Sequence, residues 1–284
     1  MNRLVTQVLN DLVDEIEAGT VPWQKSWRTG LPHNQVTLRS YHGVNVLMLW
    51  VQMLKHNYRT NGWATLKQWN SIGVKVREGE NGTPVLFYKV MNEDDEERRY
   101  SFIKCSWAYN VDQVEGFEVP AYDVDYRPDL EEFVSSLRIP IKRGGGEPSY
   151  SYTKDEIYMP LITAFGSEDD YYVTLLHEIA HATGHKSRLD RPMVGMGSIH
   201  TDAEQRQLYA AEELTAEMCA AFCGAHLRLN QDQHASYLAS WLKSWPKDKR
   251  AAALYFAAKH AGKAFDWIIE HGSVEQPTFL EAAE

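Results

Sequence analysis

The chain has 284 residues, a net charge of −10, 44% hydrophobic and 12% aromatic residues. These values exclude a disordered chain, and the length is sufficient for two domains. Three cysteines cannot form an even disulfide framework and no apolar run is long enough to span a bilayer, so we expect a cytoplasmic protein without a membrane partner.

The amino-terminal segment combines two helical patterns. Residues 2–18 place apolar side chains at helical spacing and acids on the other side, which predicts an amphipathic helix. A largely buried helix is expected from the turn at 41–45 to about residue 56. Thr65 is a candidate N-cap of a short helix that ends before Gly73.

A β region is predicted to follow these helices. Asn81-Gly82 indicates a hairpin turn, and residues 85–90 and 99–111 are strand candidates. The acidic run at 92–97 is expected to be a solvated loop between strands. The first domain is therefore predicted to be α+β.

The segment 20–90 is both basic and aromatic. It holds nine Lys or Arg side chains against two acids, and nine aromatic rings. Single-stranded nucleic acid is bound by cations along its backbone and flat rings under its bases, although scattered basic residues are usually only a solvated surface. Trp50 and Trp69 are expected in the core. The candidate stacking platforms and phosphate contacts are Trp23, Trp27 and Trp63 with Lys25, Arg28, Arg39, Arg59 and Lys67.

A domain boundary is predicted near residue 125, which gives domains at 1–125 and 126–284. The second domain has the opposite charge balance, with 16 basic and 23 acidic side chains. Residues 149–159 alternate enough to form a hairpin, and long helical patterns cover 171–183, 204–229 and 234–269. We expect a mainly helical domain with a small sheet.

His177-Glu178-Ile179-Ala180-His181 is the motif that carries chemistry in this second domain. Histidines four apart on a helix lie on one face, so both rings can bind one metal ion. Glu178 between them can act as a general base toward a water molecule on that metal. The pattern predicts a zinc hydrolase type of site, and an ordinary polar helix is the alternative.

Two histidines leave such a site one protein ligand short. Glu213 and Glu217 are four apart on the second long helix, so one can bind the metal while the other accepts a hydrogen bond from a ligand histidine. Glu212, about 100° around that helix, is expected to point elsewhere. His185 is an alternative ligand, but Gly184 is expected to end the first helix before it.

The residues do not identify the group that would stabilise an oxyanion. Tyr150, Tyr152, His185 and His200 are all candidates, and the sequence does not favour one of them.

With these residues in place, the chain resembles the ArdC antirestriction family of conjugative plasmids, whose domains also occur in plasmid primases and phage polyvalent proteins. The amino-terminal resemblance depends on Pro22-Trp23, Trp27 and the segments 41–45, 63–68, 73–79 and 109–113. The carboxy-terminal resemblance depends on the segments 155–160, 174–185, 187–189 and 209–217.

The resemblance implies an amino-terminal domain that binds single-stranded DNA and a carboxy-terminal zincin-like metallopeptidase domain. It also implies protection of incoming plasmid DNA from host restriction enzymes. By position, His177, His181 and Glu213 would bind the metal, Glu178 would be the catalytic base, and Glu217 would remain to orient a ligand histidine. Zinc is expected, although this ligand set also tolerates manganese or cobalt.

Two further functions stay open at this point. The protein could be an active metalloprotease that cleaves a host partner such as a restriction subunit. It could also be a DNA-binding module that a metal stabilises without catalysis.

Overall fold

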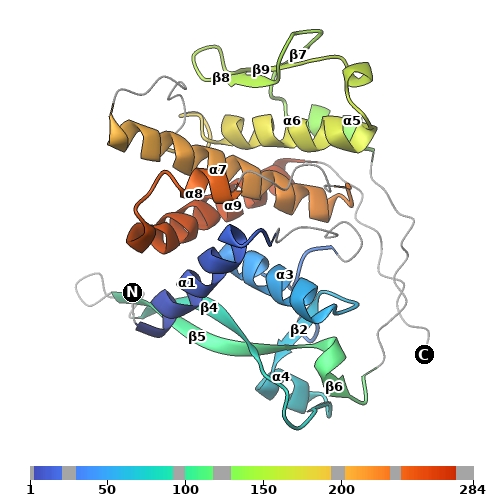
Figure 1. The fold of residues 1–284 in the computed structure, drawn as a ribbon. Helices are drawn as coiled ribbons and strands as arrows, with labels where there is room; N and C mark the ends of the chain where they lie inside the picture. The colour runs from blue at the N-terminus through green and yellow to red at the C-terminus, as the bar shows by residue number, and fades with distance from the viewer. Residues whose placement is uncertain are drawn as a thin grey trace.

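The computed structural model describes residues 3–20, 30–91, 100–117, 129–192, 202–230 and 238–272. Figure 1 shows the N-terminal elements in the lower half of the molecule and the C-terminal elements in the upper half. No helix in the described ranges is both long enough and apolar enough to cross a membrane. The arrangement confirms the predicted α+β class with two domains.

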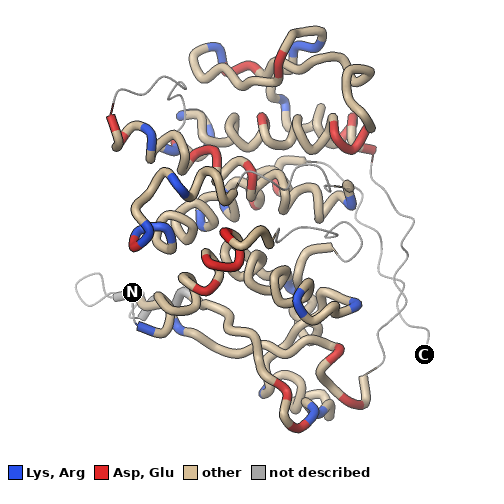
Figure 2. Tube along the Cα trace, viewed as in Figure 1, with Lys and Arg blue, Asp and Glu red and all other residues tan. Residues whose placement is uncertain are grey.

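The N-terminal helices form where the sequence predicts them. Helix α1, Arg3–Glu17, buries its apolar stripe, and its acids follow one another in its second half (Figure 2), where Glu17 forms an ion pair with Arg250. Helix α3, Val44–His56, is buried on most sides and ends at Asn57, which adopts the left-handed conformation. Helix α4, Leu66–Ser71, begins with a capping box in which Thr65 and Gln68 satisfy each other's backbone amides.

The main sheet has four strands in the order β1-β2-β5-β4. Its strands are β1 His33–Asn34, β2 Gly62–Thr65, β4 Thr83–Met91 and β5 Tyr100–Asn110. A second pair joins β3, Lys75–Val76, to β6, Val114–Glu115, after the short 3-10 helix Val111–Gln113. The hairpin predicted at Asn81-Gly82 is wrong, because β3 pairs with β6 while β4 pairs with β5.

The C-terminal domain has three layers of helix and a small sheet. A sheet of order β7-β9-β8 lies above the helices, and its β8–β9 pair confirms the predicted hairpin. The elements are α5 Leu130–Ser136, β7 Ile141–Arg143, β8 Ser149–Ser151, β9 Glu156–Met159, the 3-10 helix Ile162–Ala164, α6 Glu168–Thr183, α7 Ala203–His226, α8 Leu238–Leu242, the 3-10 helix Lys247–Lys249 and α9 Arg250–His271.

Helices α6 and α7 pack directly against each other and position the motif residues. Ser167 caps α6 by accepting a hydrogen bond from the amide of Asp170, and three acids in the first turn favour the positive end of the helix dipole. Asp202 caps α7 in the same way through Gln205. Small side chains such as Ala216 and Ala220 are buried on α7, which permits the close approach of neighbouring helices.

The two domains share one hydrophobic core. A single cluster of buried residues joins Leu9 of α1 and Leu47 of α3 with Leu176 of α6 and Leu254 of α9. At the start of α3, Gly43 has φ of 57°, and a Cβ atom there would lie 3.3 Å from the carbonyl oxygen of Ala258 on α9. Glycine is therefore required where α9 passes the N-terminal domain.

Candidate metal centre

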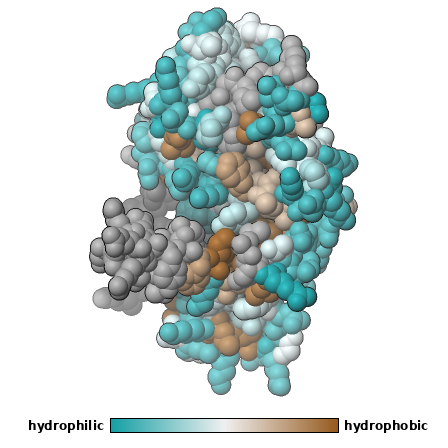
Figure 3. Space-filling model, turned by 90° about the vertical axis from the view of Figure 1, so that its left-hand side faces the viewer, coloured by the Kyte–Doolittle hydropathy of each residue, from teal (hydrophilic) through white to brown (hydrophobic). Residues whose placement is uncertain are grey.

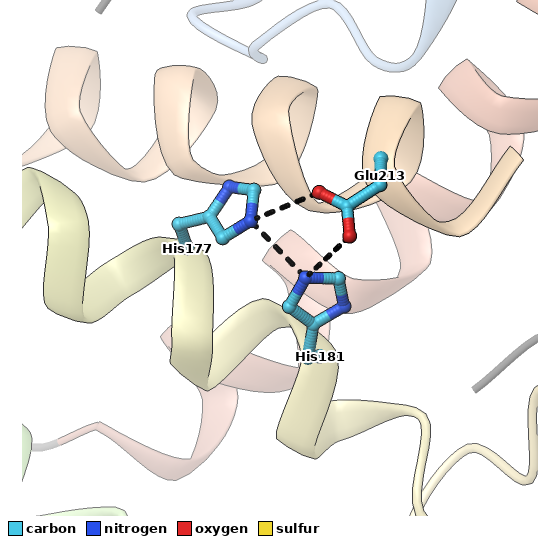
Figure 4. Close-up of side chains that lie close together, drawn as sticks. All are labelled: His177, His181 and Glu213. Carbon is cyan, nitrogen blue, oxygen red and sulfur yellow. Dashed lines mark hydrogen bonds and ion pairs between the residues drawn. The ribbon is translucent and has the colours of Figure 1, made fainter. Parts of the chain in front are cut away.

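His177 and His181 project from one face of α6 toward α7, as their spacing predicts (Figure 4). Their Nε2 atoms are 3.1 Å apart, and both side chains are largely buried. Burial by itself lowers the pKa of His177, but Glu213 and the neighbouring carboxylates outweigh it and raise that pKa to about 9. The ring nitrogens thus face one another among several carboxylates.

Glu213 of α7 completes a three-residue cluster. One of its carboxylate oxygens is 3.5 Å from His177 Nε2, and the other is 3.8 Å from His181 Nε2. Atoms that bind one ion at about 2.0–2.2 Å in tetrahedral geometry lie about 3.2–3.6 Å from one another. The three residues offer ligand atoms that all lie within 4.8 Å, so their chemistry and spacing fit a single divalent cation.

Another carboxylate lies near the Nδ1 atom of each histidine, on the ring edge away from Glu213. Glu217 Oε1 lies 3.9 Å from His177 Nδ1, which is close but beyond hydrogen-bond distance. Glu212 Oε1 lies 3.0 Å from His181 Nδ1, within that distance. The expectation that Glu212 points away from the site is therefore wrong.

Buried Arg191 holds Glu212 in place. Its Nε and Nη2 donate to the two carboxylate oxygens of Glu212 at 3.1 and 2.6 Å. Burial by itself raises the pKa of Glu212, but His181 and Arg191 lower it to about 2. Arg191 also donates to Thr183 Oγ1 and to the Ala180 carbonyl of α6. This arrangement fixes the orientation of the His181 ring, and nothing in the sequence near Arg191 indicated it.

Glu178 lies at the edge of a cavity of about 420 Å³ beside the metal cluster. The cavity is lined by His177, Glu178 and Glu217 together with Val173 and Thr174 of α6 and other residues. Glu178 is 8% exposed, so it lines the cavity while most of the residue is buried. A general base at this position would face a molecule that enters the cavity.

The oxyanion candidates within the described residues contact groups outside the three-residue cluster. The Tyr150 hydroxyl donates to Asp155 at 2.7 Å, and the Tyr152 ring lies against His185. His185 Nδ1 is 2.7 Å from Ser187 Oγ, and the metal cluster does not include it. His200 lies outside the described residues.

Tyr209, which the sequence analysis did not identify as a site residue, forms a side-chain hydrogen bond with Glu213 one turn along α7. Its half-buried ring packs edge-on against Trp241.

Apart from Trp63, the predicted DNA-binding residues fall into three groups. Arg39 and Lys67 line one cavity of about 650 Å³ in the N-terminal domain, next to Phe87. Arg59 is exposed but forms an ion pair with Asp112 at 2.6 Å. Trp23, Lys25, Trp27 and Arg28 lie outside the described residues.

Trp63 corrects the prediction of an exposed ring. Its side chain is fully buried in strand β2, like those of Trp50 and Trp69. Its polar sequence neighbour Asn61 is itself buried and donates to the Gly30 carbonyl, and its strand partner Asn110 is buried and donates to the Thr60 carbonyl. A base cannot stack on Trp63 in this structure.

Known proteins match most of the length of this chain. A family model described as the N-terminal domain of the anti-restriction factor ArdC matches residues 2–119, and a zincin-like metallopeptidase model matches residues 128–260. The crystal structure of the antirestriction protein ArdC from plasmid R388, in its metal-free form, has a TM-score of 0.77 and 32% identity over 95% of this chain and 98% of that one. The chain belongs to the ArdC antirestriction family.

Other relatives place the ArdC-like unit in different contexts. Protein y4eC of Sinorhizobium fredii is 33% identical over 92% of this chain and 90% of its own length. DNA primase TraC of Escherichia coli is 30% identical over 98% of this chain but only 28% of the primase. The Mn(II)-bound structure of R388 ArdC, with a TM-score of 0.77 and 33% identity, covers 97% of this chain and all of that one. Together with the cluster on α6 and α7, it supports one divalent metal in this chain.

Proposed function

We propose that this protein binds single-stranded DNA through its N-terminal domain and shields incoming plasmid DNA from host restriction enzymes during conjugation, in the cytoplasm. The observation that carries the DNA-binding part is the cavity of about 650 Å³ that brings Arg39 and Lys67 together. No Asp or Glu is among the described residues that line it, although the chain as a whole is acidic. A polyanion is the ligand that such a cavity attracts.

Binding of labelled oligo-dT of about 20 nucleotides, measured by fluorescence anisotropy at increasing salt, tests this proposal. We expect affinity to fall with salt by about 0.7 log units per log unit for each phosphate contact. The double substitution R39Q/K67Q should weaken binding and flatten this slope. K259Q/K263Q, which removes two exposed lysines of α9, is the matched control. Absent or salt-insensitive binding by the unsubstituted protein would reject the proposal.

We also propose a second activity, the hydrolysis of a peptide bond in a host protein partner such as a restriction subunit. The observation in its favour is that Glu178 faces the cavity beside His177, next to a cluster that fits a cation. A divalent ion bound there, zinc in our proposal, would polarise a carbonyl group and acidify a water molecule. Glu178 would take the proton from that water and deliver it to the leaving amine.

The substitution E178Q separates these functions. It should leave metal content unchanged, measured by elemental analysis, and abolish cleavage if the site is catalytic. Full protection against a restriction enzyme in an E178Q protein would show that protection does not need peptidase chemistry. The metal would then serve to stabilise a DNA-binding module, and chelation should lower the melting temperature. The same elemental analysis distinguishes zinc from manganese and cobalt.

A further inference from the structure

Two phenylalanines and a lysine share an exposed face of the β4–β5 hairpin. Phe87 pairs directly with Lys104, and Phe102 lies two residues from Lys104 on the same strand, so the three side chains project to one side. Phe87 is 42% exposed and Phe102 is 40% exposed, and Lys104 is exposed as well. Figure 3 shows apolar residues at the surface of the lower, N-terminal part of the molecule among hydrophilic ones.

Side chains on the opposite face of the hairpin pack into the fold next to these three residues, and at the start of β4 the buried Val85 does so from the Phe87 side as well. Leu86 is 6% exposed, and Ile103 and Cys105 pack against the main hydrophobic core. These residues alternate along the strands with Phe87, Phe102 and Lys104. Burial in the core therefore does not explain the two phenylalanines.

This exposed face is continuous with the basic cavity. Phe87 belongs to both, because it also lines the cavity that contains Arg39 and Lys67. Diagonal neighbours across an antiparallel pair, such as Phe87 and Phe102, lie about 7–8 Å apart, within reach of adjacent flat ligands. Rings for bases and cations for phosphates thus alternate over one surface, which is the chemistry that recognises a single strand.

We propose that the bases of single-stranded DNA stack on Phe87 and Phe102 while the phosphates follow Lys104, Arg39 and Lys67. The inference rests on the proposed single-strand binding and adds the surface that performs it. It also explains how the described part of the domain provides stacking rings although Trp63 is buried. Duplex DNA, whose bases are already stacked, does not offer its base faces to these rings.

Anisotropy titrations with oligo-dT test the two rings. F87A and F102A should each weaken binding by about 5- to 100-fold, the range for loss of one stacked base. F87L and F102L keep an apolar side chain without a flat ring and should lose as much, whereas F87Y and F102Y should bind like the unsubstituted protein. F256A removes an equally exposed phenylalanine from α9 and is the matched control, expected to leave binding unchanged.

The salt dependence distinguishes stacking from charge. The phenylalanine variants should keep the slope of affinity against salt, and K104Q should reduce it by about 0.7 for one lost phosphate contact. W107A tests the other face of β5, where Trp107 is 46% exposed, and should have no effect. If the protein binds oligo-dT and F87L/F102L binds equally well, the inference is overturned while the proposed function stands. If the unsubstituted protein fails to bind oligo-dT, the proposed function itself fails.

Discussion

Removing either partner of the Arg191–Glu212 ion pair should destabilise the protein strongly. The two side chains are 3% and 4% exposed and are joined by two hydrogen bonds. Loss of one partner leaves the other charge buried without compensation, which costs about 3–5 kcal/mol. R191M and E212Q should therefore each lower the free energy of unfolding of the metal-free protein by about that amount.

The double variant R191M/E212Q separates the pair from the individual side chains. Because neither charge remains, its loss should be smaller than the sum of the two single losses by about 2–3 kcal/mol. Urea unfolding in the presence of a chelator measures all three variants and excludes any contribution from bound metal. K142M, which breaks the exposed pair between Lys142 and Glu156, should leave the midpoint almost unchanged.

Metal affinity gives an independent measure of the same arrangement. Glu212 accepts from the Nδ1 side of His181, and its loss should reduce metal affinity about 10- to 100-fold. Competition with a chelating dye measures this change for E212Q. If each single variant lowers the free energy of unfolding by less than about 1 kcal/mol, or if the two decreases simply add in the double variant, the Arg191–Glu212 pair does not stabilise the fold through charge compensation.

Three further changes have expected results. Y209F removes the hydroxyl that forms a hydrogen bond with Glu213 and should lower metal affinity about tenfold in the dye competition. Unchanged affinity would show that this hydrogen bond does not orient Glu213 for metal binding. Gly43→Ala places a Cβ at a positive φ against α9 and should cost about 1–3 kcal/mol in urea unfolding; a neutral result would contradict the close approach. The hydrogen bond that His42 donates to Asp266 raises the pKa of His42 above 6.5, so the pair stabilises the fold below pH 6.5 and this stabilisation is lost as pH rises through the raised pKa. This exposed pair contributes about 0.5 kcal/mol or less to the free energy of unfolding. Urea unfolding at pH 6 and pH 8 measures the contribution, and Asp266→Asn should remove this part of the difference between the two pH values.

The proximity of His177 and His181 was predictable because it depends on local geometry. Two histidines four residues apart must share a face of α6, and the cap at Ser167 and the apolar positions of α6 fix that helix independently of the metal. Glu213 lies on a different helix, and its proximity depends on how α6 and α7 pack. Spacing alone left Glu213 and Glu217 as alternatives, and the resemblance to a family favoured Glu213.

The contact of Glu212 with His181 was not predicted, because the spacing around α7 was compared with only one edge of the histidine ring. Glu212 and Glu213 are adjacent, so their side chains diverge by about 100° around α7. An imidazole has two nitrogens on different edges of its ring, and Nε2 of His181 faces Glu213 while Nδ1 faces Glu212. Two consecutive residues can therefore contact the same ring from two sides. Arg191 follows the turns after α6, outside any helix or strand, so no periodic sequence pattern predicts its contact with Glu212.

The proposed DNA-binding surface illustrates what the sequence alone does not predict. Polar residues next to Trp63 suggested exposure, but Asn61 is buried and donates to the Gly30 carbonyl, and buried Asn110 on the paired strand donates to the Thr60 carbonyl. The exposed rings come instead from the β4–β5 hairpin, whose second strand lies beyond residue 90, so the segment 20–90 includes Phe87 but not Phe102. Only the register of β4 against β5 places these rings on one face. For a surface that binds a flexible strand, cross-strand pairing is thus more informative than the composition of any one segment.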